Sequence, residues 1–319
     1  MNCATSTDSA RGAKRPAGLV VLAVWLLALS HSVYAQTRIS VIYPDATTMI
    51  RKLYQTIIDG MSDSNDVRLQ SRPISDKDSA AEIKAWMRAN HTQVTVVLGD
   101  VPSTLTRPLA ADMPVLHGAG PLNDNSQSGV SLASSPAQMF SRLRLLKPNV
   151  ERIFVVYNPR ATGWLIAAAR QAARERGLEL ITSASDDILQ SGAMFTHILQ
   201  QARPGKDAIW LTLDPVVPTN QLLPVLLREA WNKHLVLFSN NPVDVAKGVL
   251  FALYPDYSAM GRQLAERAKR QLARPSLSGP EASEHLIGAV NVRTAAHLGI
   301  TLSDRQRQAF ARVFPEMRP

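Results

Sequence analysis

The chain alternates between short, almost continuous apolar runs and longer stretches in which apolar residues recur at helical spacing. The apolar runs are RISVIYP (38–44), VTVVLGD (94–100), RIFVVYNP (152–159), DAIWLTLDP (207–215) and LVLFSNNP (235–242). Each run ends in polar or turn-forming residues. Runs of this kind are typical of strands that are covered on both faces.

Between these runs lie five stretches with helical periodicity, at 47–61, 79–89, 136–146, 164–176 and 221–231. Strands that alternate with helices of this length indicate βαβ units and parallel sheets. The alternation forms one series before about Gly129 and a second series after it. The pattern therefore predicts an α/β protein with two lobes, each a mostly parallel sheet flanked by helices.

The stretch 248–274, GVLFALYPDYSAMGRQLAERAKRQLAR, indicates how the two lobes are connected. Its apolar start predicts a late strand, which Pro255 ends because proline cannot donate a hydrogen bond to a neighbouring strand. Asp256 is a suitable N-cap for a helix over 257–272. A linker rich in helix breakers, ARPSLSGPEASE, follows, and HLIGAVNV then resumes a strand pattern.

A strand, a lone helix and another strand fit a chain that leaves one lobe, adds a helix to the other lobe and returns. Together with the crossing near Gly129, this makes three hinge crossings, as in a two-lobed clamshell. The expected lobes are 36–130 plus 256–283 (N-terminal) and 131–255 plus 284–319 (C-terminal). A chain of this length is also more than one core usually holds.

Residues 1–35 have the features of a secretory signal peptide. Lys14 and Arg15 precede an uncharged run that is too short to span a bilayer comfortably, and small residues occupy 33 and 35. This order of basic, apolar and small residues predicts cleavage after Ala35. An uncleaved membrane anchor is the alternative, which the short run and the cleavage pattern disfavour. We therefore expect an exported, periplasmic protein.

The charge and the cysteine content narrow the function classes. The single cysteine, Cys3, lies in the predicted signal peptide, so the remainder has no disulfide, cysteine nucleophile or cysteine metal site. The formal net charge is +9, but the basic residues are dispersed and few aromatic residues lie among them. This distribution indicates a solubilising surface and argues against a nucleic-acid partner.

Enzyme motifs are missing from the sequence. It contains no G-x-S-x-G elbow, no P-loop and no H-E-x-x-H motif. No pair of histidines has the spacing of a metal-binding motif, so surface or core histidines are the simpler interpretation. We therefore expect no catalytic residues, no metal site and no cofactor.

Several segments of the second half resemble one family. They are GVSLASSP, LKPNVERIFVVYNP, REAWNKHLVLF, the stretch from Gly248 described above and NVRTAAHLGITL. Six positions of the last segment are similar to a family signature: Asn291, Arg293, Thr294, Ala295, Leu298 and Gly299. From about Gly129 to the C-terminus the chain resembles ABC-transporter substrate-binding proteins of the tryptophan/tyrosine-type group. That resemblance implies the type I periplasmic binding fold, in which ligand binds between two lobes.

The first half departs from the family pattern. Its opening strand and ligand-facing loop are only ISVIYPDATTM, and GAGPLNDNSQS is short and lacks the usual Asp-Pro-Val segment. Half of a clamshell site comes from these loops. The resemblance therefore supports the fold better than it supports binding of an amino acid.

Ligands of parallel α/β sheets bind beyond the carboxyl ends of the strands. The candidate ligand-binding residues at those ends are Asp45, Thr47, Asp100, His117, Asn158, Asp214, Ser239, Asn240, Tyr254 and Asp256. Neutral polar groups with a few carboxylates suit a small polar or zwitterionic ligand. A carboxylate such as Asp214 could hold an ammonium group, and Thr47 with nearby N–H groups could hold an anion.

Several of these residues can instead be explained by a structural role, without a ligand. Asp45 and Asp256 are placed as helix N-caps, and for Asp256 capping is the preferred interpretation. Asn158–Pro159 is ordinary strand-to-turn sequence. Asp100 and Asp214 directly end apolar strands, and for these two the structural and the ligand-binding interpretations remain equally open.

Two functional hypotheses follow. The first is an extracytoplasmic solute-binding protein that closes on a small, possibly amino-acid-like solute and presents it to an ABC permease. The second is a periplasmic sensing or adaptor protein of the same fold that docks on a membrane sensor or receptor, its ligand pocket eroded. The short loops of the first lobe motivate the second hypothesis.

Overall fold

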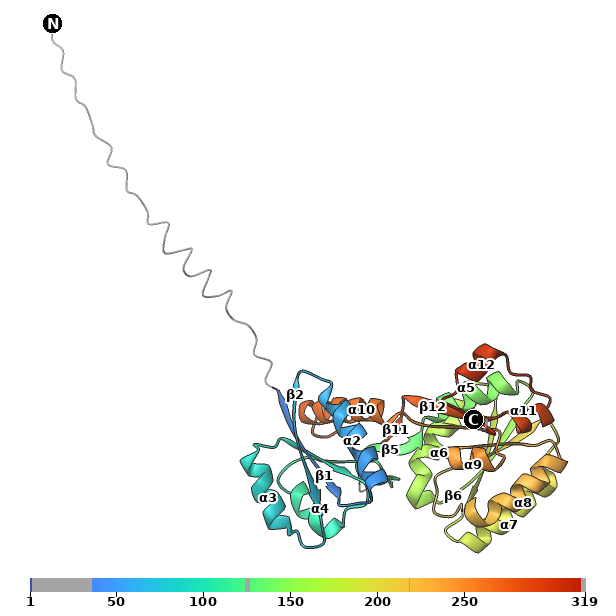
Figure 1. The fold of residues 1–319 in the computed structure, drawn as a ribbon, viewed down its shortest axis with the longest axis horizontal. Coiled ribbons are helices and arrows are strands. Elements are labelled where there is room, and N and C mark those ends of the chain that lie inside the picture. Colours follow the sequence, from blue (N-terminus) through green and yellow to red (C-terminus); the bar gives the residue numbers. More distant parts are fainter. Residues whose placement is uncertain (2–35, 124–126, 218, 317–319) are drawn as a thin grey trace. The chain divides into compact units, whose positions relative to one another are not determined.

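The computed structural model describes residues 1, 36–123, 127–217 and 219–316 (Figure 1). The predicted signal peptide and its cleavage site lie outside the described residues, apart from Met1. The described residues from Gln36 onward form one compact unit. Within the described part of the chain, no helix is both long and apolar enough to cross a membrane.

The first sheet has six strands in the order β11-β5-β4-β3-β1-β2, and all of its strand pairs are parallel. We call this sheet and the helices that pack on it the N-lobe. Its strands are β1 (Thr37–Pro44), β2 (Val67–Ile74), β3 (Val94–Leu98), β4 (Val115–Gly118), β5 (Ser128–Ser134) and β11 (Pro280–Ser283). Its helices are α2 (Thr48–Ser62), α3 (Ala80–Ala89), α4 (Ser103–Ala110) and α10 (Tyr257–Ala273).

The two faces of this sheet are covered by different helices. Along β1 and β3, alternate residues point to opposite faces. Val41 and Val96 pack with residues of α2 and α10, whereas Ile42 and Val97 pack with residues of α3 and α4. Both faces are therefore apolar, which explains why the strand sequences are almost continuously hydrophobic.

Helices α2 and α10 come from opposite ends of the chain and pack with their backbones in close approach. A Cβ atom at Gly60 would lie 2.0 Å from the carbonyl oxygen of Ser258, and one at Gly261 would lie 2.1 Å from that of Ile57. Two glycines are therefore required where these helices meet.

The second sheet has seven strands in the order β13-β12-β10-β9-β8-β6-β7, and only the β10–β12 pair is antiparallel. We call this sheet and its helices the C-lobe. Its strands are β6 (Arg152–Tyr157), β7 (Glu179–Ala184), β8 (Asp207–Leu211), β9 (Val236–Ser239), β10 (Phe251–Pro255), β12 (Leu286–Asn291) and β13 (Arg312–Phe314). Its helices are α5 (Pro136–Leu146), α6 (Pro159–Arg174), α7 (Ile188–Gln201), α8 (Thr219–Asn232), α9 (Pro242–Lys247), α11 (Val292–His297) and α12 (Asp304–Gln308).

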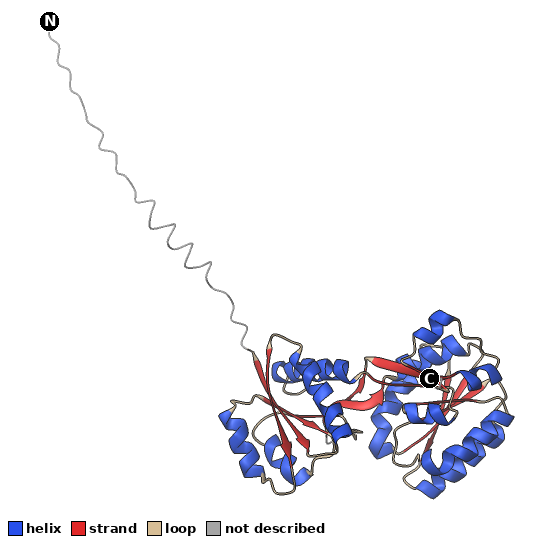
Figure 2. Cartoon of the chain, in the orientation of Figure 1, coloured by secondary structure: helices blue, strands red, loops and turns tan. Residues whose placement is uncertain are grey.

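The chain passes between the two sheets three times, as the pattern predicts. The passages follow β5, β10 and β11, and Figure 2 shows strands and helices gathered in two groups joined by these segments. The Ser134 hydroxyl donates to the carbonyl of Leu253 at 2.7 Å, and the Asp256 N–H donates to the carbonyl of His285 at 3.0 Å. The three passages are therefore bonded to one another.

The predicted strand, proline stop and N-cap at 249–256 are confirmed. Strand β10 ends at Pro255, and the Asp256 carboxylate accepts a hydrogen bond from the N–H of Ala259 at 3.0 Å. The interpretation of 273–284 purely as a linker is wrong, since Pro280–Ser283 forms strand β11 beside β5. Proline is tolerated there because β11 is the edge strand of its sheet.

Candidate functional site

The main candidate site lies at the carboxyl ends of β8 and β9 in the C-lobe. A cavity of about 530 Å³ opens there between the loops that follow these strands, the start of α6 and part of the N-lobe. Its lining residues are Pro121, Leu122, Asn123, Leu132, Ala161, Thr162, Thr212, Leu213, Asp214, Pro215, Val217, Ser239, Asn241 and Asp244. Ligands of parallel α/β sheets occupy this position.

Asp214 organises the loop after β8. Its carboxylate accepts hydrogen bonds from the backbone N–H of Asn158 and of Val216, both at 2.9 Å, and from the hydroxyl of Thr162. Asp214 is nearly fully buried. Three donors already satisfy this carboxylate, so its first role is to fix the loop against the N-terminus of α6.

Asp244, in the first turn of α9, has a different environment. Its Oδ2 accepts a hydrogen bond from the Ser239 hydroxyl at 2.6 Å, and that hydroxyl oxygen accepts one from the Asn241 N–H at 3.0 Å. Asp244 as a residue is 1% exposed, and its Oδ1 has no hydrogen-bond partner among the described residues. The Oγ1 atom of Thr212, also in the lining, is buried and likewise has no hydrogen-bond partner in the described part of the chain.

Burial raises the pKa of the Asp244 carboxyl, although the hydrogen bond from Ser239 and the charge of Lys247 act in the opposite direction. Burial disfavours the charged form of an acid when too few donors replace water. Asp244 is thus a partly satisfied acidic group at the wall of a cavity. Such groups are found preferentially at functional sites.

The N-lobe supplies the opposite wall through the segment after β4 and through Leu132 of β5. The indole N–H of Trp164, on α6, donates to the carbonyl of Leu122 at 2.9 Å. This bond joins the C-lobe helix to the N-lobe segment beside the cavity. The two walls are therefore in direct contact at one edge of the site.

Among the candidates from the C-lobe, the structure brings Asp214 and Ser239 together in the cavity. Asn158 adjoins them: its N–H binds Asp214, and its side chain caps α6. The Asn240 amide oxygen accepts from the indole N–H of Trp210, and Asn240 does not line the cavity. Tyr254 belongs to the buried core.

The candidates from the N-lobe lie outside the cavity lining, as does Asp256, the N-cap of α10. Asp45 forms an ion pair with Arg51 at 2.7 Å and is largely exposed. The prediction of Asp45 as an N-cap is wrong, since α2 begins at Thr48 and its N-cap residue is Thr47, whose side chain makes no capping hydrogen bond. Asp100 is exposed after β3, and His117 lies in β4, where burial lowers its pKa.

The lining also contains polar residues that were not predicted from the sequence: Thr162, Thr212, Asn241 and Asp244. Asp244 had a detectable signal, because it follows the strand end SNNP by two residues and so falls in the first turn of a helix at the carboxyl edge. Within the described part of the chain, no three His, Cys, Asp or Glu side chains gather closely enough to hold a metal ion.

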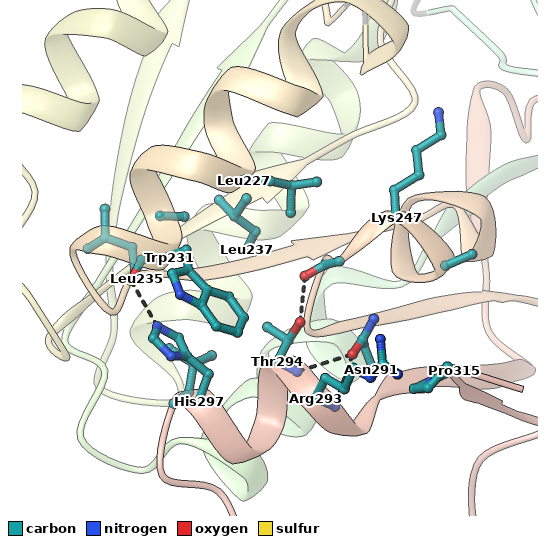
Figure 3. A pocket seen from close by; sticks show the side chains of 14 residues that line it. Leu227, Trp231, Leu235, Leu237, Lys247, Asn291, Arg293, Thr294, His297 and Pro315 are labelled. Carbon is teal, nitrogen blue, oxygen red and sulfur yellow. Dashed lines mark hydrogen bonds between the residues drawn. The ribbon is translucent and has the colours of Figure 1, made fainter. Parts of the chain in front are cut away.

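A second cavity, of about 290 Å³, lies at the opposite edge of the C-lobe sheet, between α8, α9 and α11 (Figure 3). Asn291 and Thr294 line it, and the Thr294 hydroxyl donates to the carbonyl of Gly248 at 2.8 Å. The rings of Trp231 and His297 stack in its wall with centroids 3.5 Å apart. We call this the amino-edge cavity and the first one the carboxyl-edge cavity.

Comparison with known proteins gives no sequence relative: no protein-family model and no curated protein matches this chain. Solved structures do match. A conserved domain protein from Vibrio cholerae is 17% identical, with a TM-score of 0.51, over 87% of this chain and 99% of its own. An ABC domain from Streptococcus pneumoniae in complex with L-Trp is 16% identical, with a TM-score of 0.51, over 88% and 100%.

A third similar structure is the ligand-free, open form of a substrate-binding protein with adhesive properties from Clostridium difficile. It is 13% identical, with a TM-score of 0.56, over 87% of this chain and 99% of its own. Likeness at these identities concerns the fold. The chain therefore has the α/β, two-lobed fold of type I periplasmic binding proteins.

Proposed function

We propose that this protein is an extracytoplasmic solute-binding protein of an ABC-type importer, which captures a small polar solute between its lobes. The carboxyl-edge cavity is the observation that carries the proposal. It has the volume of a small-molecule site, mixes apolar walls with a few polar groups and takes walls from both lobes. Similar folds include a substrate-binding protein and an L-Trp complex.

Binding in this position can be linked to a hinge motion. The lobes are joined by three adjacent passages, and hinge closure around a ligand is a common response in two-lobed binding proteins. A solute that contacts Leu122 on one lobe and the β8–β9 loops on the other stabilises the arrangement in which both walls are near. The closed form is then the one presented to a permease.

A thermal-shift screen of the purified protein against amino acids, amines, nucleosides, sugars and organic acids tests this function. A solute at a hundred times its Kd stabilises the folded state by about 2.7 kcal/mol, which is a visible shift in Tm. Small-angle scattering with and without the hit then measures compaction. A folded protein that responds to no solute in the panel contradicts the transport role.

Export is tested separately. We propose that the chain is cleaved after Ala35 and acts outside the cytoplasm, because residues 1–35 have the order of a secretory signal. N-terminal sequencing of the protein from a periplasmic extract should begin at Gln36. Recovery of the full-length chain in the cytoplasmic fraction would contradict this location.

A second candidate function is a periplasmic sensing or adaptor protein that docks on a membrane sensor or receptor. One observation favours it: the N-lobe candidates Asp45, Thr47 and Asp100 lie outside the cavity, so the C-lobe supplies most of the polar wall. Neighbouring genes discriminate the two functions. Permease and ATPase genes favour transport, whereas a sensor or receptor gene favours the adaptor.

A further inference from the structure

The charged residues of the carboxyl-edge cavity all have the same sign. Among the described residues, its lining contains two carboxylates, Asp214 and Asp244, and no lysine, arginine or histidine. A zwitterionic amino acid would bring its own carboxylate into this cavity without a side-chain cation to pair with it. The charge balance of the lining thus favours a cation over a zwitterion or an anion.

The two carboxylates are not equally available to a ligand. Asp214 already accepts hydrogen bonds from Asn158, Thr162 and Val216. Asp244 receives only the Ser239 hydroxyl, and its Oδ1 has no partner among the described residues. A buried oxygen without a donor is costly, so a ligand that supplies a donor gains from pairing with it.

Thr212 adds to the same lining a second oxygen that has no partner within the described part of the chain. The remaining walls are apolar and include Leu122, Leu132 and Val217. An ammonium group has several N–H donors, so it can bind a carboxylate and a hydroxyl together. An apolar body on that ammonium would be covered by the leucine and valine side chains.

We propose that the solute is an organic amine without a carboxylate, whose ammonium group is held by Asp244 and Thr212 and whose apolar part packs on Leu122, Leu132 and Val217. This inference rests on the proposed solute-binding function and narrows its substrate class. The raised pKa of Asp244 agrees with it, because an ammonium partner would supply the compensation that the buried carboxyl lacks.

The test compares ligands that share one apolar body and differ only in charge. Tryptamine, L-tryptophan and indole-3-propionic acid form one such series, and phenethylamine, L-phenylalanine and 3-phenylpropionic acid form a smaller one. Isothermal titration calorimetry on the purified protein measures each Kd. We expect at least one amine to bind about tenfold or more tightly than its matched amino acid, with the matched acid weakest.

Two substitutions locate the binding. Asp244→Asn should weaken the amine by about thirtyfold or more, and Thr212→Val should weaken it severalfold. Asp100→Asn is the matched control, because Asp100 is an exposed carboxylate outside the cavity lining. It should leave the affinity unchanged. Circular dichroism and Tm of each variant establish that it is folded.

The outcomes separate this inference from the proposed function. Tighter binding of the amino acid or the acid overturns the inference, as does unchanged amine affinity in Asp244→Asn, which would mean that water satisfies Oδ1. The inference is also overturned if neither tryptamine nor phenethylamine binds. If another solute from the broad screen then binds, the solute-binding function stands; if none does, both fall.

Discussion

The C-lobe sheet has a cavity at each edge, and the two differ in how their polar groups are satisfied. In the carboxyl-edge cavity, Asp244 Oδ1 and Thr212 Oγ1 are buried and have no hydrogen-bond partner among the residues that the structure describes. In the amino-edge cavity, Thr294 donates to Gly248 O, and a ring nitrogen of His297 lies 2.9 Å from the carbonyl of Trp231. Among the described residues, no buried side-chain atom of that second lining lacks a partner.

This difference is the one expected between the proposed binding site and a gap left by side-chain packing. Polar groups that already bond one another hold the fold and gain little from a ligand, whereas buried groups with unmade bonds gain from one. Helix α9 runs between the two edges: Asp244 lines the first cavity and Lys247 the second. Substitutions matched across the two cavities therefore test the distinction directly.

The largest expected effect comes from filling the first cavity. Ala161→Trp places a large ring in its lining and should lower the affinity for the identified solute by about a hundredfold or more, equivalent to about 2.7 kcal/mol. Ala246→Trp, in the lining of the amino-edge cavity, is the matched control and should leave the Kd unchanged. Calorimetric titration gives both values, and similar losses in the two variants would remove the distinction.

Asp214→Asn should destabilise the protein by about 2–3 kcal/mol. Asp214 accepts three hydrogen bonds, and the amide nitrogen of asparagine cannot accept any of them. Urea unfolding measures the change, with Asp100→Asn as the exposed control. An unaltered unfolding midpoint would show that Asp214 is not the structural carboxylate of the pair.

The pH dependence of stability should identify Asp244 as the under-satisfied carboxylate. Its folded-state pKa is raised by burial, so its contribution is favourable at low pH and is lost as pH rises through the folded pKa. Between the unfolded-state and the folded-state pKa of Asp244, the free energy of unfolding should fall by up to about 1.4 kcal/mol per pH unit. The Asp244→Asn variant has no carboxyl to titrate at this position. In the absence of solute, it should therefore be more stable than the wild-type protein at pH values above the folded-state pKa of Asp244.

Unfolding free energies of both proteins measured across pH check this expectation. Identical pH profiles would mean that Asp244 does not titrate differently in the folded and unfolded states. Asp214 is the other carboxylate of the cavity lining, and the charge of Lys247 opposes the rise in the pKa of Asp244. The Lys247→Gln variant therefore serves as a control for the effect of that charge.

The smallest effect is expected in the amino-edge cavity. Thr294→Val removes the hydrogen bond to Gly248 O and should cost about 1 kcal/mol of stability without changing solute affinity. Thermal unfolding and titration of the same preparation measure the two quantities. A change in affinity would indicate that the amino-edge cavity communicates with the solute site.

The fold was predictable because buried parallel strands need apolar residues on both faces. That requirement made β1, β3, β6, β8 and β9 visible as apolar runs, and Pro255 with Asp256 marked the change from β10 to α10. Strand β2 was not predicted, because it is an edge strand with several exposed residues and so lacks a continuous apolar run. Strand β11 was not predicted, because it begins with a proline that follows a glycine, a sequence that is typical of a linker.

The site was less predictable, because a residue type at a strand end does not reveal its partners. Asp214 and Asp244 are both carboxylates near the carboxyl edge, yet one has three donors and the other has one. The donors of Asp214 come from 158–162 and 216, which are brought together only by the fold. The sequence alone therefore could not show which of the two carboxylates has fewer hydrogen-bond donors.

The pairing of α2 with α10 has a consequence for the order in which the chain folds during synthesis. The central C-lobe strands, β6 to β10, come from one continuous stretch, so they can assemble as soon as it is complete. The N-lobe cannot, because α10 and β11 are made more than a hundred residues after β5. Until α10 is made, α2 covers only part of the apolar face that the two helices share, so the half synthesised first is expected to be the last to reach its native state.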